Sequence, residues 1–319
     1  MDRIEIIEKW IKSKLNQDFK VVPASSDASF RRYFRIISNN KTYILMDAPP
    51  DLERIDHFIN ITNKLVNAEI NAPKIISFDT ELGFILMTDF GSQTFLDVLD
   101  SNNSRNLYSK AIHSLLEIQT KVDIKGLQDY SEDLLLGEML LFPEWYLAKF
   151  KKFKLEDQAV VHEIFSLISK KTLTQNKCFI HRDYHSRNLM FIEEDNLGIL
   201  DYQDAVVGPL TYDLVSLLKD AYIELDEDFV LDQSVRYWEK AKQAGLIKNE
   251  DFSSFYEDFE WMGVQRHLKI LGIFSRLSIR DKKDQYLKDI PLVEKYLMFT
   301  SERYKSLHPL RRLLDKVIS

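Results

Sequence analysis

Six polar residues stand close together between two apolar tracts near the middle of the chain. The segment "CFIHRDYHSRNLMF" covers residues 178–191, and its polar members are His181, Arg182, Asp183, His185, Arg187 and Asn188. A buried strand rarely contains so many ionisable side chains, and a surface loop does not need apolar residues on both sides. The pattern therefore predicts a firmly held loop that performs chemistry or binds a ligand.

The two histidines of this loop first suggest a metal-dependent hydrolase. His181 and His185 are separated by three residues, and Asp183 lies between them. Zinc sites usually have three or four protein ligands, whereas the other histidines of the chain stand singly and far apart. The hydrolase remains an alternative that rests on one short cluster.

An acidic residue further along the chain favours a different metal. Asp201 ends the apolar run "LGILD" after the turn-like "EEDN", so a hairpin would bring its carboxylate near Asn188. An amide oxygen and a carboxylate oxygen suit Mg²⁺, whose other positions are filled by water and substrate phosphates. We therefore predict Asn188 and Asp201 as magnesium ligands, with Asp183 beside the metal to accept a hydroxyl proton.

The composition of the chain excludes several classes of protein. Its 319 residues, 45% hydrophobic and 29% charged, are typical of a globular protein long enough for two lobes. The net charge of −7 disfavours nucleic acid as a partner, and no apolar run reaches the ~20 residues of a membrane span. A single cysteine, Cys178, suits a reducing compartment. We expect a cytoplasmic protein without a nucleic-acid or membrane partner, and the oligomeric state is not defined.

The elements that must hold the loop change in character along the chain. Short runs rich in β-branched and aromatic residues predict strands over 19–23, 32–37, 42–47, 74–78 and 83–87. Helical spacing predicts one helix within this region, over 51–68. We expect the whole region, residues 1–90, to form a small β-rich lobe.

The remainder, residues 91–319, is predicted to be a large and mainly helical lobe that carries the loop. Candidate helices cover 96–99, 108–122, 134–150, 157–169, 214–224 and 228–244. Short strands are expected only in the centre, over 178–180, 189–192 and 197–201.

The central motif resembles that of a known enzyme family. The segment "HRDYHSRN" (181–188), followed by Asp201, is similar to the catalytic and metal loops of the aminoglycoside-phosphotransferase/choline-kinase group of protein-kinase-like enzymes. The segment "GPLTYDLVSLL" (208–218) is similar to the next element of that group, in which an acidic residue at the position of Asp213 supports the loop. The resemblance implies an α+β, protein-kinase-like bilobal fold that uses ATP and Mg²⁺.

Further segments narrow the resemblance to the anomeric amino-sugar kinases of bacterial cell-wall recycling. These segments are "SSDASFRRYFRI" (25–36), "YILMDAPP" (43–50), "GFILMTDFG" (83–91), "FPEWYL" (142–147), "ILDYQDAVVGPLTYDLVSLL" (199–218) and "QRHLKILGIFSRLSIRDKKDQYLKDIP" (265–291). Enzymes of that family use ATP to phosphorylate the anomeric hydroxyl of N-acetylmuramate or N-acetylglucosamine. The resemblance implies the same reaction and a small-molecule sugar as the partner.

The resemblance also suggests roles for residues of the helical lobe. Asp183 is the expected catalytic base, and His181 is expected to support its loop together with Asp213. The expected substrate-binding residues, with His185 also bracing the loop, are His185, Glu144, Asp204 and Arg266. Arg266 lies off an apolar helical stripe, where it either meets the carboxylate of N-acetylmuramate or faces water.

The nucleotide site is expected in the β-rich lobe and departs from the family pattern. The turn "SSDASF" has no glycine, so its small residues Ser26 and Ser29 either let backbone N–H groups approach the phosphates or form an ordinary polar turn. At the lobe junction, Met87, Thr88 and Asp89 are expected to present backbone groups to the adenine.

A second departure is the missing lysine of strand three, which in protein kinases binds the phosphates. The run "TYILMD" contains none. Strand alternation places Arg32 on the same face as Phe34, and an arginine among apolar residues is costly unless it meets an anion. Arg32 therefore either replaces the lysine, oriented by Glu53 or Asp56, or forms a buried structural ion pair.

Two competing functions remain open at this point. Another kinase of the same fold would act on an aminoglycoside, choline or another amine, and would need an acidic pocket. A catalytically inactive ATP-binding module is suggested by the missing lysine and glycines, but such a module would not need Asp183, Asn188 and Asp201 together. The preference between N-acetylmuramate and N-acetylglucosamine is not defined by the sequence.

Overall fold

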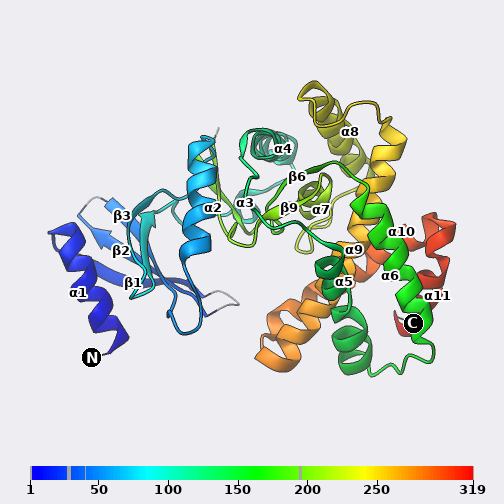
Figure 1. Ribbon diagram of the computed structural model, residues 1–319, viewed down its shortest axis with the longest axis horizontal. Helices are drawn as coiled ribbons and strands as arrows, with labels where there is room; N and C mark the ends of the chain where they lie inside the picture. Colours follow the sequence, from blue (N-terminus) through cyan, green and yellow to red (C-terminus); the bar gives the residue numbers. More distant parts are fainter. Residues whose placement is uncertain (1, 27–29, 40, 194–195, 319) are drawn as a thin grey trace. The chain divides into compact units, whose positions relative to one another are not determined.

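The computed structural model describes residues 2–26, 30–39, 41–193 and 196–318 (Figure 1). The chain divides into two compact units. Unit 1 comprises Met1–Val98 and Asn188–Gln203, and unit 2 comprises Leu99–Arg187 and Asp204–Ser319. The division differs from the predicted one at residue 90, because unit 1 extends to Val98 and also includes a segment from the middle of the chain.

Unit 1 is built on an antiparallel sheet with the strand order β1-β2-β3-β5-β4. The strands are β1 (Lys20–Ser26), β2 (Arg32–Ser38), β3 (Lys41–Asp47), β4 (Ile75–Asp79) and β5 (Phe84–Thr88). All five overlap predicted strands, and β1 extends three residues beyond the predicted end at residue 23. The helix α2 (Asp56–Asn67) begins later than predicted, because the N–H groups of Leu52 and Glu53 both donate to the carbonyl of Pro49 and form a turn.

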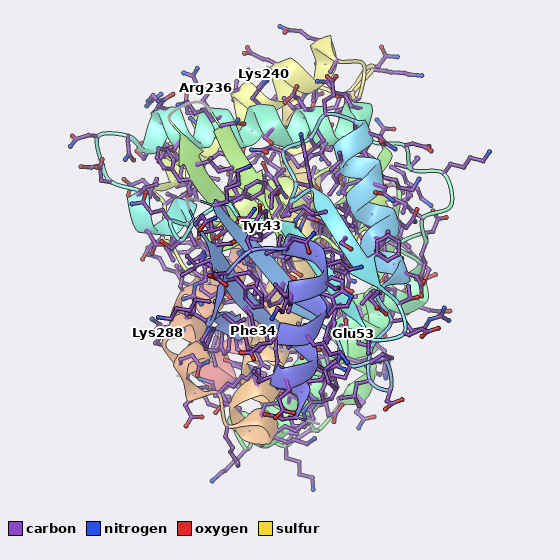
Figure 2. The ribbon with its side chains drawn as sticks, turned by 90° about the vertical axis from the view of Figure 1, so that its left-hand side faces the viewer. Phe34, Tyr43, Glu53, Arg236, Lys240 and Lys288 are labelled. Atoms are coloured by element: carbon purple, nitrogen blue, oxygen red, sulfur yellow. The ribbon has the colours of Figure 1, made fainter. Side chains whose placement is uncertain are left out.

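Helix α1 (Arg3–Leu15) covers one face of this sheet, as Figure 2 shows. Trp10 packs against Phe84, with ring centroids 5.5 Å apart. The burial of β2 alternates, so that Phe34 and Ile36 lie in the core under α1 while Ile37 is exposed. The period of two therefore sets which side chains of β2 face α1 and which face the opposite side.

A hairpin from the middle of the chain completes unit 1. Its strands are β7 (Leu189–Glu193) and β8 (Asn196–Ile199). The N–H of Ile199 donates to the carbonyl of Asn71 at 2.9 Å. Beyond the hairpin, the ring of Tyr202 stacks on Phe58 of α2, and its hydroxyl lies 3.0 Å from that of Thr62. These contacts explain why residues 188–203 belong to unit 1.

Unit 2 is mainly helical. Its principal elements are α4 (Ser104–Lys121), α5 (Glu132–Met139), the π-helix η1 (Phe142–Phe150), α6 (Gln158–Leu173), α7 (Tyr212–Leu218), α8 (Glu227–Gln243), α9 (Phe252–Asp281), α10 (Ile290–Arg303) and α11 (His308–Ile318). Two short strands, β6 (Lys177–Ile180) and β9 (Val206–Pro209), pair beside them. None of the helices in the described ranges is long and apolar enough to cross a bilayer.

The predicted helix over 134–150 is two elements, α5 and η1. Pro143 stands in the first turn of η1, where its missing N–H is tolerated, whereas it would interrupt a continuous helix. The long helix α9 contacts both of these elements as well as α6, α7, α8 and α10. It therefore forms the centre of unit 2.

Helix α9 approaches the start of η1 closely at Gly272. A Cβ added at this position would lie 2.4 Å from the carbonyl carbon of Leu141 and 2.6 Å from its oxygen. We expect Gly272→Ala to lower the free energy of unfolding by about 1–3 kcal/mol, since backbone atoms must move to admit the methyl group.

Urea unfolding of this variant beside Gly137→Ala provides a matched comparison. Gly137 is an exposed residue of α5 with nothing within 4 Å of an added Cβ, so alanine should leave stability unchanged or raise it by up to about 1 kcal/mol. Equal stability of the two variants would show that α9 and η1 are not in tight contact.

Candidate active site

The predicted loop follows β6 and turns sharply at Arg182. The φ of Arg182 is 75°, in the left-handed region that residues other than glycine rarely adopt. Asp213, in the first turn of α7, binds the backbone on this side. Its Oδ2 accepts the N–H of His181 at 2.6 Å, and its Oδ1 accepts the N–H of Arg182 at 3.0 Å.

Two other contacts hold the same residue. Arg266 of α9 donates from Nη1 to the carbonyl oxygen of Arg182 at 2.7 Å, and the Arg182 guanidinium pairs with Glu138 of α5. Strained backbone persists only where the surroundings enforce it, and it is concentrated at functional sites. The residue that precedes Asp183 is therefore held through its N–H, its carbonyl and its side chain.

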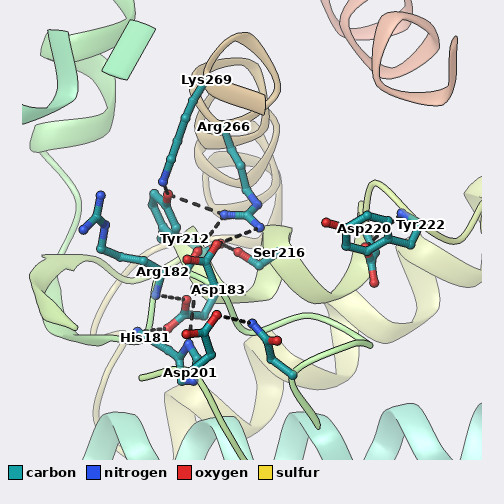
Figure 3. A network of polar contacts seen from close by, with 12 residues as sticks. His181, Arg182, Asp183, Asp201, Tyr212, Ser216, Asp220, Tyr222, Arg266 and Lys269 are labelled. Atoms are coloured by element: carbon teal, nitrogen blue, oxygen red, sulfur yellow. Dashed lines mark hydrogen bonds and ion pairs between the residues drawn. The ribbon is translucent and has the colours of Figure 1, made fainter. Parts of the chain in front are cut away.

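Asp183 itself is a partly accessible carboxylate among cations. Its side chain is 36% exposed, and Nη2 of Arg266 lies 3.8 Å from its Oδ1. Figure 3 shows Arg266 and Lys269 extending from α9 towards this loop. Burial favours the protonated acid, but Lys269 and then Arg266 outweigh it and hold the pKa of Asp183 well below its usual range. Asp183 is therefore ionised at neutral pH and can accept a hydrogen bond from a hydroxyl group.

The cations beside Asp183 are themselves balanced by a buried acid. Glu138 accepts hydrogen bonds from Gln265 and Tyr130, and its Oε1 lies 3.2 Å from Nζ of Lys269. Burial opposes ionisation of Glu138, but Lys269 and Arg182 outweigh it and lower its pKa to about 2. Glu138 therefore links α5 and α9 to the loop that carries Asp183.

This part of the site was not predicted from the sequence. Arg266 was expected either to bind a substrate carboxylate or to face water, whereas it is only 4% exposed and donates to the loop backbone. The alternative that it faces water is wrong. Glu138 of α5 was not identified at all. For this part of the site, the only signal in the sequence was that polar residues stand off the apolar stripe of α9.

The second half of the loop is held by Asp220, a residue that was also not predicted. Asp220 is 2% exposed, and its Oδ2 accepts the N–H of Ser186 at 3.0 Å and the Ser186 hydroxyl at 2.6 Å. His185 packs edge-on against Tyr222 at 5.3 Å. Burial lowers the pKa of His185 below its ordinary value, so this imidazole is neutral at pH 7 and braces the loop without a charge.

The histidines do not form a metal site. His181 is fully buried, and its Nδ1 accepts the N–H of Asp183 at 3.2 Å. In the described part of the chain, no three His, Cys, Asp or Glu side chains are grouped so that they could hold a metal ion. The hydrolase alternative therefore has no ligand set among these residues.

The two expected magnesium ligands lie together in unit 1. Nδ2 of Asn188 is 3.2 Å from Oδ2 of Asp201, and Oδ1 of Asp201 accepts a hydrogen bond from Gln203 at 2.6 Å. A half-turn of the Asn188 amide presents its oxygen in place of its nitrogen. Two hard oxygen ligands suit Mg²⁺, which takes its other ligands from phosphates and water. The residues fit this metal, although Asp201 follows β8 and does not end the strand as predicted.

Arg32 has a different partner from the one predicted. Its Nη2 lies 2.5 Å from Oδ2 of Asp47, a fully buried carboxylate that also binds Arg3 of α1 at 2.6 Å. Glu53 was expected to orient Arg32 but pairs with Arg31. That expectation is wrong, because the alternation of β2 turns Arg32 towards α1 and Arg31 towards the opposite side. The structure shows the structural ion pair for Arg32, so the argument for a phosphate contact no longer applies to it.

The segment expected to contact adenine, residues 87–89, is held by hydrogen bonds to other parts of unit 1. The N–H of Thr88 donates to the carbonyl of Lys74 at 3.0 Å. Asp89 forms a two-point ion pair with Arg35 of β2, at 2.6 and 3.1 Å. Met87 is buried in β5. An adenine contact from this segment therefore uses backbone groups other than the N–H of Thr88.

The remaining predicted residues lie in several places. Ser29 lies outside the described residues, and only the backbone of Ser26 is described, at the end of β1. Glu144 is an exposed residue of η1 that pairs with Lys149 at 2.9 Å. Asp204 is exposed, and its carbonyl accepts a hydrogen bond from Arg182 at 3.3 Å, which places it beside the loop that carries Asp183.

Asp213 gives the loop a predicted pH dependence of stability. Burial raises its pKa to about 7, although the N–H groups of His181 and Arg182 favour the ionised form. The unfolded chain releases this proton near pH 3.9 (about the ordinary Asp value), so the native state binds more protons between pH 4 and 7. Stability therefore falls as the pH rises through this window, by at most about 1.4 kcal/mol per pH unit.

We expect Asp213→Asn, which cannot titrate, to remove this contribution. The free energy of unfolding of the wild type, minus that of the variant, should decrease between pH 5 and pH 7. Urea unfolding of both proteins at several pH values measures this difference. A difference that stays constant, or that increases with pH, would show that Asp213 has no raised pKa.

The loop with Asp183 lies in the helical unit, and the hairpin with Asn188 and Asp201 lies in the sheet unit. These are features expected of a phosphotransferase with a protein-kinase-like fold. The chain matches the phosphotransferase enzyme family (APH) over residues 20–246 and belongs to that family. Among solved structures, it is similar to choline kinase LicA from Streptococcus pneumoniae, with a TM-score of 0.64, 15% identity and coverage of 92% of this chain and 98% of the other. It is also similar to the ADP-bound aminoglycoside phosphotransferase APH(2'')-Ib, with a TM-score of 0.60, 15% identity and coverage of 92% and 98%.

Sequence relatives match over the whole length. A protein of Neisseria meningitidis named N-acetylmuramate/N-acetylglucosamine kinase is 41% identical over 100% of this chain and 97% of its own. A protein of Pseudomonas aeruginosa with the same name is 43% identical over 98% of this chain and 96% of its own. The resemblance identified from the central motif and the scattered segments is confirmed.

Proposed function

We propose that this protein uses ATP to phosphorylate the anomeric hydroxyl of N-acetylmuramate or N-acetylglucosamine. The observation that supports the proposal is the sequence identity of 41–43%, over essentially the whole chain, to proteins named as kinases of these two sugars. The chemistry of the loop supports it, since Asp183 is ionised and partly accessible. We further propose that the sugar 1-phosphate serves peptidoglycan recycling.

In the proposed reaction, the Asp183 carboxylate accepts a hydrogen bond from the attacking hydroxyl and takes its proton. The hydroxyl oxygen forms a bond to the γ-phosphorus of ATP while the bond to the β–γ bridging oxygen breaks, and ADP leaves. Asn188 and Asp201 would hold a magnesium ion, which would supply positive charge to the phosphates. Arg266 and Asp213 keep the Asp183 loop in place through the backbone of Arg182.

The electrostatics of Asp183 favour the anomeric hydroxyl as the acceptor. A carboxylate whose pKa lies below its ordinary value is a weak base and is poorly matched to an ordinary alcohol. The anomeric hydroxyl of a sugar is more acidic than the other hydroxyls, so its proton is released more readily in the late stages of a loose transition state. The anomeric hydroxyl is therefore the position on the sugar that a weak base such as Asp183 suits best.

A cationic amine is a poorer candidate for the substrate. Around the first half of the loop, the acidic residues Asp183, Glu138 and Asp213 are matched by the basic residues Arg182, Arg266 and Lys269. The three basic residues act on Asp183, and their positive charge disfavours a cationic amine beside this carboxylate. For the sugar itself, we propose His185, Glu144 and Asp204 as contact residues, and we propose backbone groups of Met87 and Asp89 for the adenine.

A screen of ATP consumption tests the proposed substrate class. Purified protein with Mg²⁺ is given N-acetylglucosamine, N-acetylmuramate, an aminoglycoside and choline in parallel. We expect turnover with the two amino sugars only, and none with the methyl glycoside of N-acetylglucosamine, in which the anomeric oxygen is blocked. Turnover of an amine, or of the methyl glycoside, would overturn the proposal while leaving the family assignment intact.

A further inference from the structure

Arg31, next to the start of β2, forms an ion pair on the side of the sheet opposite α1. Its Nε donates to Oε1 of Glu53 at 2.5 Å, and its side chain is only 10% exposed. Burial disfavours the charged guanidinium, but Glu53 outweighs it and raises the pKa of Arg31 above its ordinary value. The cation is therefore permanent and has a fixed orientation.

The two arginines of β2, Arg32 and Arg35, have different surroundings from Arg31. Arg32 points towards α1 and shares the buried Asp47 with Arg3. Arg35 is held by both oxygens of Asp89 and by the carbonyl of Gly91. Glu53, the partner of Arg31, lies instead in the turn immediately before α2, and Figure 1 shows α1 and α2 on opposite sides of the sheet. Arg31 is thus the arginine associated with α2.

Helix α2 also supports the magnesium ligands. Phe58 stacks on Tyr202 with ring centroids 5.3 Å apart, and Thr62 forms a hydrogen bond with the Tyr202 hydroxyl at 3.0 Å. Tyr202 is the neighbour of Asp201 in the chain. The turn that carries Glu53 and the residue beside Asp201 are therefore connected through one helix, so the cation and the metal ligand share a support within unit 1.

We propose that Arg31 binds the phosphate chain of ATP and that Glu53 positions its guanidinium. The inference rests on the proposed use of ATP. A nucleoside triphosphate carries several negative charges, and a single divalent ion does not neutralise all of them. A protein-kinase-like site supplies a further cation, which is held by a carboxylate near a helix. The lysine of strand β3, Lys41, is exposed at the first residue of the strand, and the run over 42–47 contains none. A guanidinium matches phosphate oxygens in a two-point geometry.

The proposal is tested by calorimetric titration of Arg31→Met with magnesium–ATP and with adenosine, which lacks phosphates. Arg32→Met, which changes the adjacent arginine, is the matched control. We expect Arg31→Met to bind magnesium–ATP at least tenfold more weakly and adenosine within twofold of the wild type. The control variant should bind magnesium–ATP within threefold of the wild type.

The outcomes are distinct. Wild-type affinity of a folded Arg31→Met for magnesium–ATP, or an equal loss for ATP and adenosine, would overturn the role of Arg31. If Arg31→Met does not fold, Arg31→Lys keeps the charge, and we then expect a loss of three- to tenfold for magnesium–ATP alone, so an unchanged affinity would overturn the proposal. A wild-type protein that binds no magnesium–ATP would instead contradict the proposed function itself.

Discussion

Replacing Asp183 with asparagine is expected to abolish sugar phosphorylation while magnesium–ATP affinity stays within about twofold. An amide cannot take the hydroxyl proton and carries no negative charge, and loss of a general base typically costs about 10²–10⁴ in rate. Nucleotide affinity should be retained because the proposed metal ligands, Asn188 and Asp201, belong to unit 1, whereas Asp183 belongs to unit 2. Steady-state turnover at saturating sugar and ATP, with a parallel titration of ATP binding, measures both effects.

The matched control is Asp228→Asn, which removes an exposed carboxylate of the same unit on α8. Its turnover should equal that of the wild type. If Asp183→Asn retained a tenth or more of wild-type turnover, Asp183 would not be the base. A large loss of ATP affinity in the same variant would mean that this residue serves the nucleotide as well.

Replacing Asp201 with alanine is expected to remove the effect of magnesium on nucleotide binding. Loss of groups that merely orient a metal ligand typically costs about 10–100-fold in metal affinity, so loss of the ligand itself should cost at least as much. Titration of ATP in the presence of Mg²⁺ and in the presence of a chelator measures the effect. In the wild type, Mg²⁺ should strengthen binding, and in Asp201→Ala the two titrations should agree.

Gln203→Ala provides a graded comparison, because Gln203 only donates a hydrogen bond to Asp201 at 2.6 Å. It should weaken magnesium-dependent binding by less than Asp201→Ala does. Unchanged magnesium–ATP affinity in Asp201→Ala would mean that the metal site lies elsewhere.

The parts of the fold that were predicted from the sequence depend on local patterns. The strands of the sheet in unit 1 are short runs rich in β-branched and aromatic residues, bounded by turn residues, and each forms where such a run occurs. The break at Pro143 was missed because the apolar spacing of α5 continues into η1, although the proline cannot continue the hydrogen bonds of α5. A period alone does not distinguish one helix from two that pack on the same neighbour.

Only those parts of the site whose residues lie close together in the sequence were predicted. The loop around Asp183 and the hairpin that joins Asn188 to Asp201 could be identified from spacing and from the family resemblance. Glu138 and its contacts with Arg182 and Lys269 could not be identified, because a buried charge is stable only with partners that the fold brings from distant segments.

The ion pair of Arg32 is a second case in which the sequence did not reveal the partner of a charged side chain. The alternation of β2 correctly placed it on the same face as Phe34, but the anion on that face is Asp47, which is shared with Arg3 from the first helix. A single sequence offers no signal for that pairing. The direction of a side chain can be predicted from a strand pattern, whereas its partner depends on the tertiary structure.

The central claim is that the enzyme phosphorylates an amino sugar at its anomeric oxygen. Phosphorus NMR of the product formed from N-acetylglucosamine, ATP and Mg²⁺ tests this claim most directly. The account predicts a sugar phosphate whose phosphorus couples to the anomeric proton, that is, a 1-phosphate. A product phosphorylated at the 6-position, with phosphorus coupled to the protons of that carbon, would contradict it.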